Sequence, residues 1–342
     1  MKTLLSVIVG VACALGCAPR VMAQGQAPPS TPCEAVKDIQ VICGQQGPED
    51  LVVLPDGKWV IASEMTGTGG INAIRVSDRM SMRVYPSASA KQQFDAKTYA
   101  GCPGRPDTSK FTTHGLWLRG GRGPVYTLFV VGHGSRESIE VFTVDARAGT
   151  PVLTWIGCAV APDPIGLNSV RGLPDGGFIA SNFLARNVTP EQRQKFFAGE
   201  NNGELWEWHT ASGWQKIPGS EAAGANGLEM SNDGKWLYVD AWASQSFFRL
   251  SRGSTPVMRK EIPLGFRVDN VRRARDGSLI ATGQGQQSTE IVRIDPNTLA
   301  VKKLVHRPDD ASFRSGTVAV EVGDRLWVGS FQGDRIAILP AR

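Results

Sequence analysis

The sequence of 342 residues lacks most features that mark nucleic-acid-binding, membrane-spanning and thiol-dependent proteins. Its formal net charge is only +5, and it becomes +3 without Lys2 and Arg20, which is too weak to favour nucleic acid or an anionic membrane as a partner. Beyond residue 23, no stretch reaches the ~20 uninterrupted apolar residues of a transmembrane helix, so no transmembrane segment is predicted. The sequence has no CxxC pair for thiolate zinc ligation and no GxSxG for a serine nucleophile.

An apolar run does occur at the start, over residues 4–18, between Lys2 and the small-residue pattern Val21-Met22-Ala23. This arrangement predicts a secretory signal peptide over residues 1–23 and a mature chain over residues 24–342 that is secreted or periplasmic. A lipoprotein signal with Cys17 as the lipidated residue is the alternative.

The mature chain keeps four cysteines, an even number that favours disulfides in an exported protein. Four cysteines allow three connectivities. The expected pairs are Cys33 with Cys43 and Cys102 with Cys158.

One hairpin pattern recurs along the chain: a short apolar strand, a glycine-containing turn, and a second apolar strand. It is clear in residues 51–63, 169–181, 227–239 and 270–282, where the turn is Asp-Gly, and weaker in 115–131 and 317–330. Six such repeats without a convincing helical periodicity predict an all-β fold, a six-bladed β-propeller formed by residues 24–342 as a single domain. An irregular β-sandwich is the alternative.

A polar side chain stands seven residues before the turn in five of the six repeats, at Glu49, His114, Asn168, Asn226 and Asp269, with Gly316 in the sixth. The innermost strands of a propeller line its central channel, so these residues should converge at one mouth. Asn270 follows Asp269 and joins the same group. The oxygen donors form a set of two carboxylates and three amides, which suits calcium better than magnesium or zinc. The predicted metal ligands are Glu49, Asn168, Asn226, Asp269 and Asn270, although any one of them alone would be read as a turn or loop residue.

The second strand of each hairpin returns to the same face, which places a further residue from every repeat on the rim: Glu64, His133, Asn182, Trp242, Gly283 and Phe331. His114 and His133 should therefore lie close together. His114 is the candidate general base and His133 its proton relay, unless both are simply hydrogen-bonded rim residues. His209 and His306 fall outside this pattern and are interpreted as surface or loop residues.

Asp50, directly after Glu49, has two interpretations. It either holds a second, structural cation deeper in the channel, or caps the entrance of the strand in a hydrated position.

Residues 183–203 leave the same rim and contain the clearest helix signals of the chain. Thr189 is the expected N-cap, with Pro190 at the first helical position, Gln192 at the third, and Gly199 as the stop. The short helix carries Phe196 and Phe197, which either cover the site or pack the helix onto the blades.

Short motifs in a fixed order resemble those of the paraoxonase family, within a wider group that includes gluconolactonase and regucalcin: GPEDLVVLPDG, THGLWL, VVGHG, LNSV, GANGLEMSNDGKWLYV and VDN. The resemblance spans roughly residues 40–340. It implies a six-bladed propeller, a catalytic calcium held by the five ligands above, the histidine pair His114 and His133, and hydrolysis of lactones and aryl esters. Ser169 stands where paraoxonases have an aspartate, which argues against a second calcium at Asp50. Gluconolactonase and regucalcin lack the histidine pair.

The sequence therefore predicts a secreted, calcium-dependent hydrolase of small-molecule lactones or aryl esters, in which His114, assisted by His133, activates water. One alternative is a sugar-lactone hydrolase that uses an acidic ligand as its base. The other is a calcium-stabilised propeller that binds a partner without catalysis.

Overall fold

A computed structural model of the chain describes residues 39–121 and 123–341. The predicted signal peptide over residues 1–23, the alternative lipid site at Cys17, and Cys33 all lie outside the described residues. The signal peptide and the Cys33–Cys43 disulfide therefore stay predictions.

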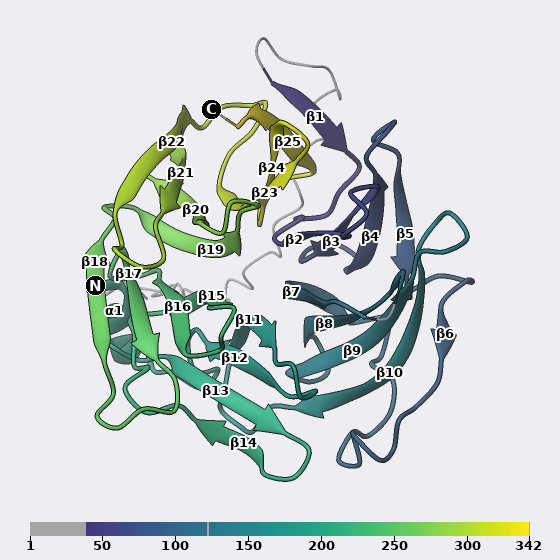
Figure 1. Cartoon of the computed structure of the whole chain (residues 1–342), viewed down its shortest axis with the longest axis horizontal. Helices are drawn as coiled ribbons and strands as arrows, with labels where there is room; N and C mark the ends of the chain where they lie inside the picture. Colours follow the sequence, from purple (N-terminus) through teal and green to yellow (C-terminus); the bar gives the residue numbers. More distant parts are fainter. Residues whose placement is uncertain (1–38, 122, 342) are drawn as a thin grey trace, which may run out of the picture. The chain divides into compact units, whose positions relative to one another are not determined.

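The described residues form six sheets arranged around a common centre (Figure 1). From the centre outward, the first sheet contains β2 (Leu51–Val53), β3 (Trp59–Glu64), β4 (Gly70–Arg75) and β5 (Ser81–Tyr85). The second contains β7 (Thr112–Arg119), β8 (Val125–His133), β9 (Ser138–Asp145), β10 (Val152–Val160) and β6 (Lys91–Gln92). The third contains β11 (Leu167–Gly172), β12 (Phe178–Asn182), β13 (Glu204–His209) and β14 (Gly213–Lys216). The fourth sheet contains β15 (Ala225–Met230), β16 (Trp236–Ala241), β17 (Ser246–Ser251) and β18 (Arg259–Pro263). The fifth contains β19 (Arg267–Arg273), β20 (Leu279–Gly285), β21 (Ser288–Ile294) and β22 (Val301–Pro308). The sixth contains β23 (Gly316–Val322), β24 (Arg325–Ser330), β25 (Arg335–Pro340) and β1 (Gln40–Cys43).

The prediction of a six-bladed propeller is confirmed, and the sandwich alternative is wrong. Each predicted hairpin forms the two innermost strands of one blade, and the six inner strands contact one another in a closed ring. The polar residues of the repeats therefore share one channel.

The sixth blade joins the two ends of the described chain. β1 pairs antiparallel with β25, with Gln40 opposite Ile338. This pairing closes the ring without leaving β25 as a free edge, which would otherwise offer unpaired backbone groups to other chains.

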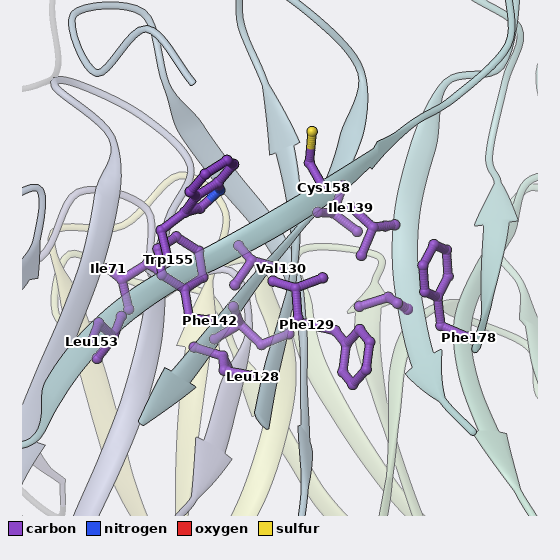
Figure 2. Packing of buried hydrophobic residues seen from close by; sticks show 14 of the residues in the cluster. Ile71, Leu128, Phe129, Val130, Ile139, Phe142, Leu153, Trp155, Cys158 and Phe178 are labelled. Atoms are coloured by element: carbon purple, nitrogen blue, oxygen red, sulfur yellow. The ribbon is translucent and has the colours of Figure 1, made fainter. Parts of the chain in front are cut away.

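Apolar side chains fill the space between neighbouring blades. The largest buried cluster extends from the first blade to the third and includes Trp155, which is fully buried. Figure 2 shows part of it, with Phe129 of β8 and Phe178 of β12 on neighbouring sheets and their ring centres 5.9 Å apart. Truncating such a ring to alanine costs about 3–5 kcal/mol, so this packing holds the blades in a fixed register around the channel.

The predicted disulfide between Cys102 and Cys158 is present. It ties the segment before β7 to β10 within the second blade, with a Cα–Cα distance of 5.2 Å.

The predicted helix is α1 (Pro190–Phe197), with Thr189 as its N-cap. The Gln192 backbone N–H donates to Thr189 Oγ1 over 3.2 Å, and the Thr189 backbone N–H donates to Gln192 Oε1 over 2.8 Å, so both halves of a capping box are formed. Gly199 follows the helix with φ of +87°, a conformation that favours glycine. Within residues 39–121 and 123–341, no helix is long and apolar enough to cross a membrane.

Candidate functional site

The inner strands are irregular at one common level. Pairing with the second strand skips residues 114–115, 168–169, 226–227, 269 and 317–318. Such bulges re-aim side chains out of the regular alternation. Four of the predicted site residues lie in them: His114, Asn168, Asn226 and Asp269. In four of the six blades, the shared offset in the sequence is thus a bulge in the fold.

These bulges place the predicted ligands around a cavity of about 460 Å³ at one mouth of the channel. Glu49, Asn168, Asn226 and Asp269 line the cavity, together with His114. Asn270 is buried beside them, and its Nδ2 donates to Glu49 Oε1 over 2.5 Å. All five predicted metal ligands are therefore brought together, while Gly316 adds no side chain from the sixth blade.

Four side-chain oxygens of this group are buried without a hydrogen-bond partner among the described residues: Glu49 Oε2, Asn168 Oδ1, Asn226 Oδ1 and Asn270 Oδ1. Buried polar atoms are almost always partnered in folded proteins, so four unpartnered acceptors at one place need a donor or a cation. Oxygen-only donors of this kind suit calcium. No three His, Cys, Asp or Glu side chains converge as metal ligands in the described parts of the chain, so amide oxygens carry much of this donor set.

The two carboxylates of the site are buried, where a negative charge is energetically unfavourable. Burial raises the pKa of Glu49 well above its usual range, and the charges of Asp269 and Asp50 raise it further. Burial likewise raises the pKa of Asp269 to about 7. A divalent cation among them would offset both the lost hydration and the mutual repulsion.

Gln284 of β20 orients one of these carboxylates, a role that the sequence analysis missed. Its Nε2 donates to Asp269 Oδ2 over 2.7 Å and to the Gly316 carbonyl over 2.8 Å, while its Oε1 accepts from Trp242 Nε1 over 3.0 Å. Neither repeat offset marks this position, because Gln284 lies one residue beyond Gly283, the rim position of the fifth blade.

The two histidines lie in direct contact beside the ligand group. His114 Nδ1 is 3.0 Å from His133 Nε2, and His114 Nε2 lies 3.6 Å from Glu49 Oε2 and 3.4 Å from Asn168 Nδ2. Burial lowers the pKa of His114 well below its usual value, and the neighbouring His133 lowers it further. His114 is therefore a neutral imidazole at neutral pH, able to accept a proton.

His133 is bonded in turn to Glu137, a second residue that the sequence analysis missed. His133 Nδ1 lies 2.8 Å from Glu137 Oε1, and Glu137 Oε2 accepts from the backbone N–H of Leu167 over 3.1 Å. The other two histidines are elsewhere, on the outer strands β13 and β22, where His209 pairs with Glu207 and His306 with Glu290.

Aromatic rings form one wall of the cavity. Phe196 of α1 stacks on Trp242 with ring centres 5.9 Å apart, and Phe183 meets Trp242 edge-on at 5.7 Å. Phe196 is 2% exposed, whereas Phe197 is 53% exposed and still lines the cavity. The helix thus both packs onto the blades and borders the site.

Of the six rim residues expected from the returning strands, Gly283 has no side chain and pairs with Val268 in its sheet, and the other five divide into two groups. His133, Trp242 and Phe331 line the cavity. Glu64 and Asn182 are buried in their own hydrogen bonds, Glu64 with Asn72 over 2.9 Å and Asn182 with Glu204 over 2.8 Å. Only the first group is available to a ligand.

The hydrated-cap interpretation of Asp50 is wrong, and the contacts of its carboxylate disfavour a second cation. Asp50 is fully buried, so it is not a hydrated cap, and its Oδ2 is paired with the Arg272 guanidinium. The backbone N–H groups of Leu51 and Leu116 donate to Asp50 over 2.8 and 2.6 Å. A guanidinium therefore takes the place that a second cation would need, in keeping with Ser169 two blades away.

A second cavity of about 510 Å³ lies among the hairpin turns at the opposite end of the channel, lined by Asp56, Trp117, Glu229 and Arg272. Two of its lining charges already have ionic partners: Glu229 accepts from Arg171 over 2.6 Å, and Arg272 is bonded to Asp50. Of these two cavities, only the first is lined by histidines and by side chains with unpartnered oxygens among the described residues, so the chemistry is assigned there.

No protein-family model matches this sequence, and no curated protein sequence matches it. Solved structures do match in fold. A gluconolactonase from Xanthomonas campestris is 15% identical, with 90% of this chain and 91% of that chain covered and a TM-score of 0.54. A calcium-binding regucalcin from Agrobacterium tumefaciens is 12% identical, with 90% and 95% covered and a TM-score of 0.53. A virginiamycin B lyase from Staphylococcus aureus is 13% identical, with 89% and 99% covered and a TM-score of 0.54. A lyase scores as well as a lactonase, so these likenesses show the propeller fold alone.

Proposed function

We propose that this protein is a secreted, calcium-dependent hydrolase of lactones and aryl esters. One observation carries the proposal: four buried, unpartnered oxygens face one mouth of the channel, and His114 Nε2 lies beside them. Export is supported by residues 4–18 and by the Cys102–Cys158 disulfide, since such bonds persist in oxidising compartments.

The cation would be held by Glu49, Asn168, Asn226, Asp269 and Asn270. These residues supply two carboxylates and three amides and no nitrogen or sulfur ligand, which favours calcium over zinc. When bound, calcium polarises the carbonyl of a lactone or ester and stabilises negative charge on its oxygen. The five side chains position the cation, and Gln284 fixes the orientation of Asp269.

The histidine pair handles the proton. As water attacks the carbonyl carbon, His114 Nε2 accepts the proton that the water loses, and the ring later returns it to the leaving alkoxide. His133 holds the other nitrogen of His114 over 3.0 Å, which keeps the ring directed at the ligand group. A base of this kind distinguishes the site from a sugar-lactone hydrolase that relies on an acidic ligand.

The aromatic wall of the cavity favours a substrate with apolar groups over a sugar lactone. Phe183, Phe196, Phe197 and Trp242 offer ring faces and edges rather than hydrogen-bond partners for several hydroxyl groups. An aryl or alkyl group next to the scissile carbonyl would pack against them.

A substrate panel tests the proposal. The purified protein, supplied with calcium, should hydrolyse aryl esters and alkyl-substituted lactones and lose this activity when a chelator is added. Preference for gluconolactone would favour the sugar-lactone alternative. Inactivity on every lactone and ester with calcium bound would contradict hydrolysis and leave the non-catalytic binding propeller.

Replacing His114 by glutamine should lower kcat by about 10²-fold, since glutamine keeps similar bulk but cannot accept the proton. KM should change little if His114 acts mainly in the transition state. Steady-state kinetics measure both constants, and calcium content should stay at the wild-type level because His114 is not a ligand. Near-normal turnover in the variant would exclude His114 as the base and favour an acidic ligand such as Asp269.

A further inference from the structure

Glu137, His133 and His114 form a continuous hydrogen-bonded chain that ends at the ligand group. Glu137 Oε1 meets His133 Nδ1 over 2.8 Å, and His133 Nε2 meets His114 Nδ1 over 3.0 Å. The side chains of Glu137 and His133 are 11% and 21% exposed, so water has limited access to these bonds. The end of the chain is His114 Nε2, close to Glu49 and Asn168.

The chemistry of each group fixes where the hydrogens lie. A carboxylate only accepts hydrogen bonds, so Glu137 requires a hydrogen on His133 Nδ1. A neutral imidazole carries one N–H, so His133 Nε2 then has a lone pair and must accept from His114 Nδ1–H. His114 Nε2 is consequently left with its lone pair facing the ligand group. Asn168 Nδ2, a donor 3.4 Å from that nitrogen, agrees with this assignment.

We propose that Glu137 is a positioning residue that sets the tautomers of both histidines and so presents the basic nitrogen of His114 to the substrate. This inference rests on the proposed function for its catalytic consequence, but the tautomers themselves are independent of it. Glu137 lies in the turn between β8 and β9 and reaches the third blade through Leu167 N–H. It therefore couples the relay to β11, which carries Asn168.

The Leu167 contact makes glutamine an informative substitution. In Glu137→Gln, Leu167 N–H still requires an acceptor, so the amide oxygen should stay on that side. The amide nitrogen then faces His133 Nδ1 and donates to it. His133 must carry its hydrogen on Nε2, His114 must accept at Nδ1, and the hydrogen of His114 moves to Nε2. Glu137→Gln therefore leaves His114 Nε2 without the lone pair that it needs to accept a proton, although the side chain keeps its size and shape.

Nitrogen-15 NMR of histidine-labelled protein, with and without calcium, reads these tautomers directly. In the wild type, His114 and His133 should both be protonated at Nδ1, and in Glu137→Gln both should be protonated at Nε2. The kcat of Glu137→Gln should fall by about 10²-fold with KM unchanged. Glu137→Ala should lose less activity, because it removes the orienting bond without imposing the wrong tautomer, and Glu137→Asp should recover part of the rate.

The Glu290–His306 pair in the outer part of the fifth blade provides a matched control. Glu290 Oε1 lies 2.5 Å from His306 Nδ1 on β21 and β22. Glu290→Gln should change the His306 signals and leave turnover unaltered.

Three results would overturn the inference: wild-type His114 protonated at Nε2, unchanged tautomers in Glu137→Gln, or a larger kcat loss in Glu137→Ala than in Glu137→Gln. Failure of the proposed function is a separate result. If the wild type hydrolyses nothing but shows the expected tautomers that invert in Glu137→Gln, the role of Glu137 in positioning stands and the reaction must be sought elsewhere.

Discussion

Replacing Asp269 by alanine is expected to abolish hydrolysis and calcium binding together. Asp269 is one of only two carboxylates in the proposed ligand set, so the variant loses half of the negative charge that holds the cation. The stabilisation that a bound ion gives is lost as well, about 2.7 kcal/mol when free calcium is 100-fold above its dissociation constant. The melting temperature of the variant should therefore no longer rise when calcium is added.

Asp56→Ala is the matched control, because Asp56 lies exposed in the hairpin turn between β2 and β3. This variant should keep wild-type turnover, calcium content and calcium-dependent melting. Metal analysis, kinetics and thermal melts of the two variants together measure the effect. If Asp269→Ala binds calcium and turns over like the wild type, the assigned ligand set is incorrect.

Replacing Arg272 by methionine is expected to lower the free energy of unfolding by about 3–5 kcal/mol. Arg272 is 7% exposed and Asp50 is fully buried, so the substitution leaves a carboxylate without its counter-charge inside the channel. The carbonyls of Leu51 and Leu116 also lose a donor. Denaturant unfolding measures the change in free energy.

Two comparisons separate this effect from a general loss of an arginine. Arg275 pairs with Glu321, but its side chain is 67% exposed, so Arg275→Met should cost less than about 1 kcal/mol. Adding Asp50→Asn to Arg272→Met removes the unpaired charge and should recover part of the stability. A loss of under about 1 kcal/mol in Arg272→Met would show that the buried pair does not stabilise the fold.

The blades and the site cluster were predictable because a propeller repeats one local pattern. The turn of each hairpin shows which residue of the chain reaches the mouth of the channel. Counting seven residues back from the turns gives Glu49, His114, Asn168, Asn226 and Asp269. The closing strand β1 was not predicted, since its four residues carry no turn or repeat and their partners lie about 300 residues away.

Contacts between side chains of different blades could not be predicted from the sequence either. The partner of Asp50 is Arg272, which is 222 residues away in the sequence. Arg272 lies in the predicted hairpin 270–282, but the repeat pattern does not indicate which residue it contacts. Glu137 and Gln284 lie outside the two offsets that the repeats share, so the sequence pattern does not mark them. Which side chains meet at the axis depends on how the bulges turn them, and the bulges are visible only as broken pairing in the folded sheets.

Calorimetric titration of the metal-free protein with calcium, with lactone and aryl-ester hydrolysis followed at each point, examines the site and its chemistry at once. We expect a single class of site with one calcium per chain, and hydrolysis that rises in proportion to its occupancy. Absence of calcium binding, or hydrolysis that is equally fast in the chelated protein, would contradict the proposed calcium site and its role in the reaction.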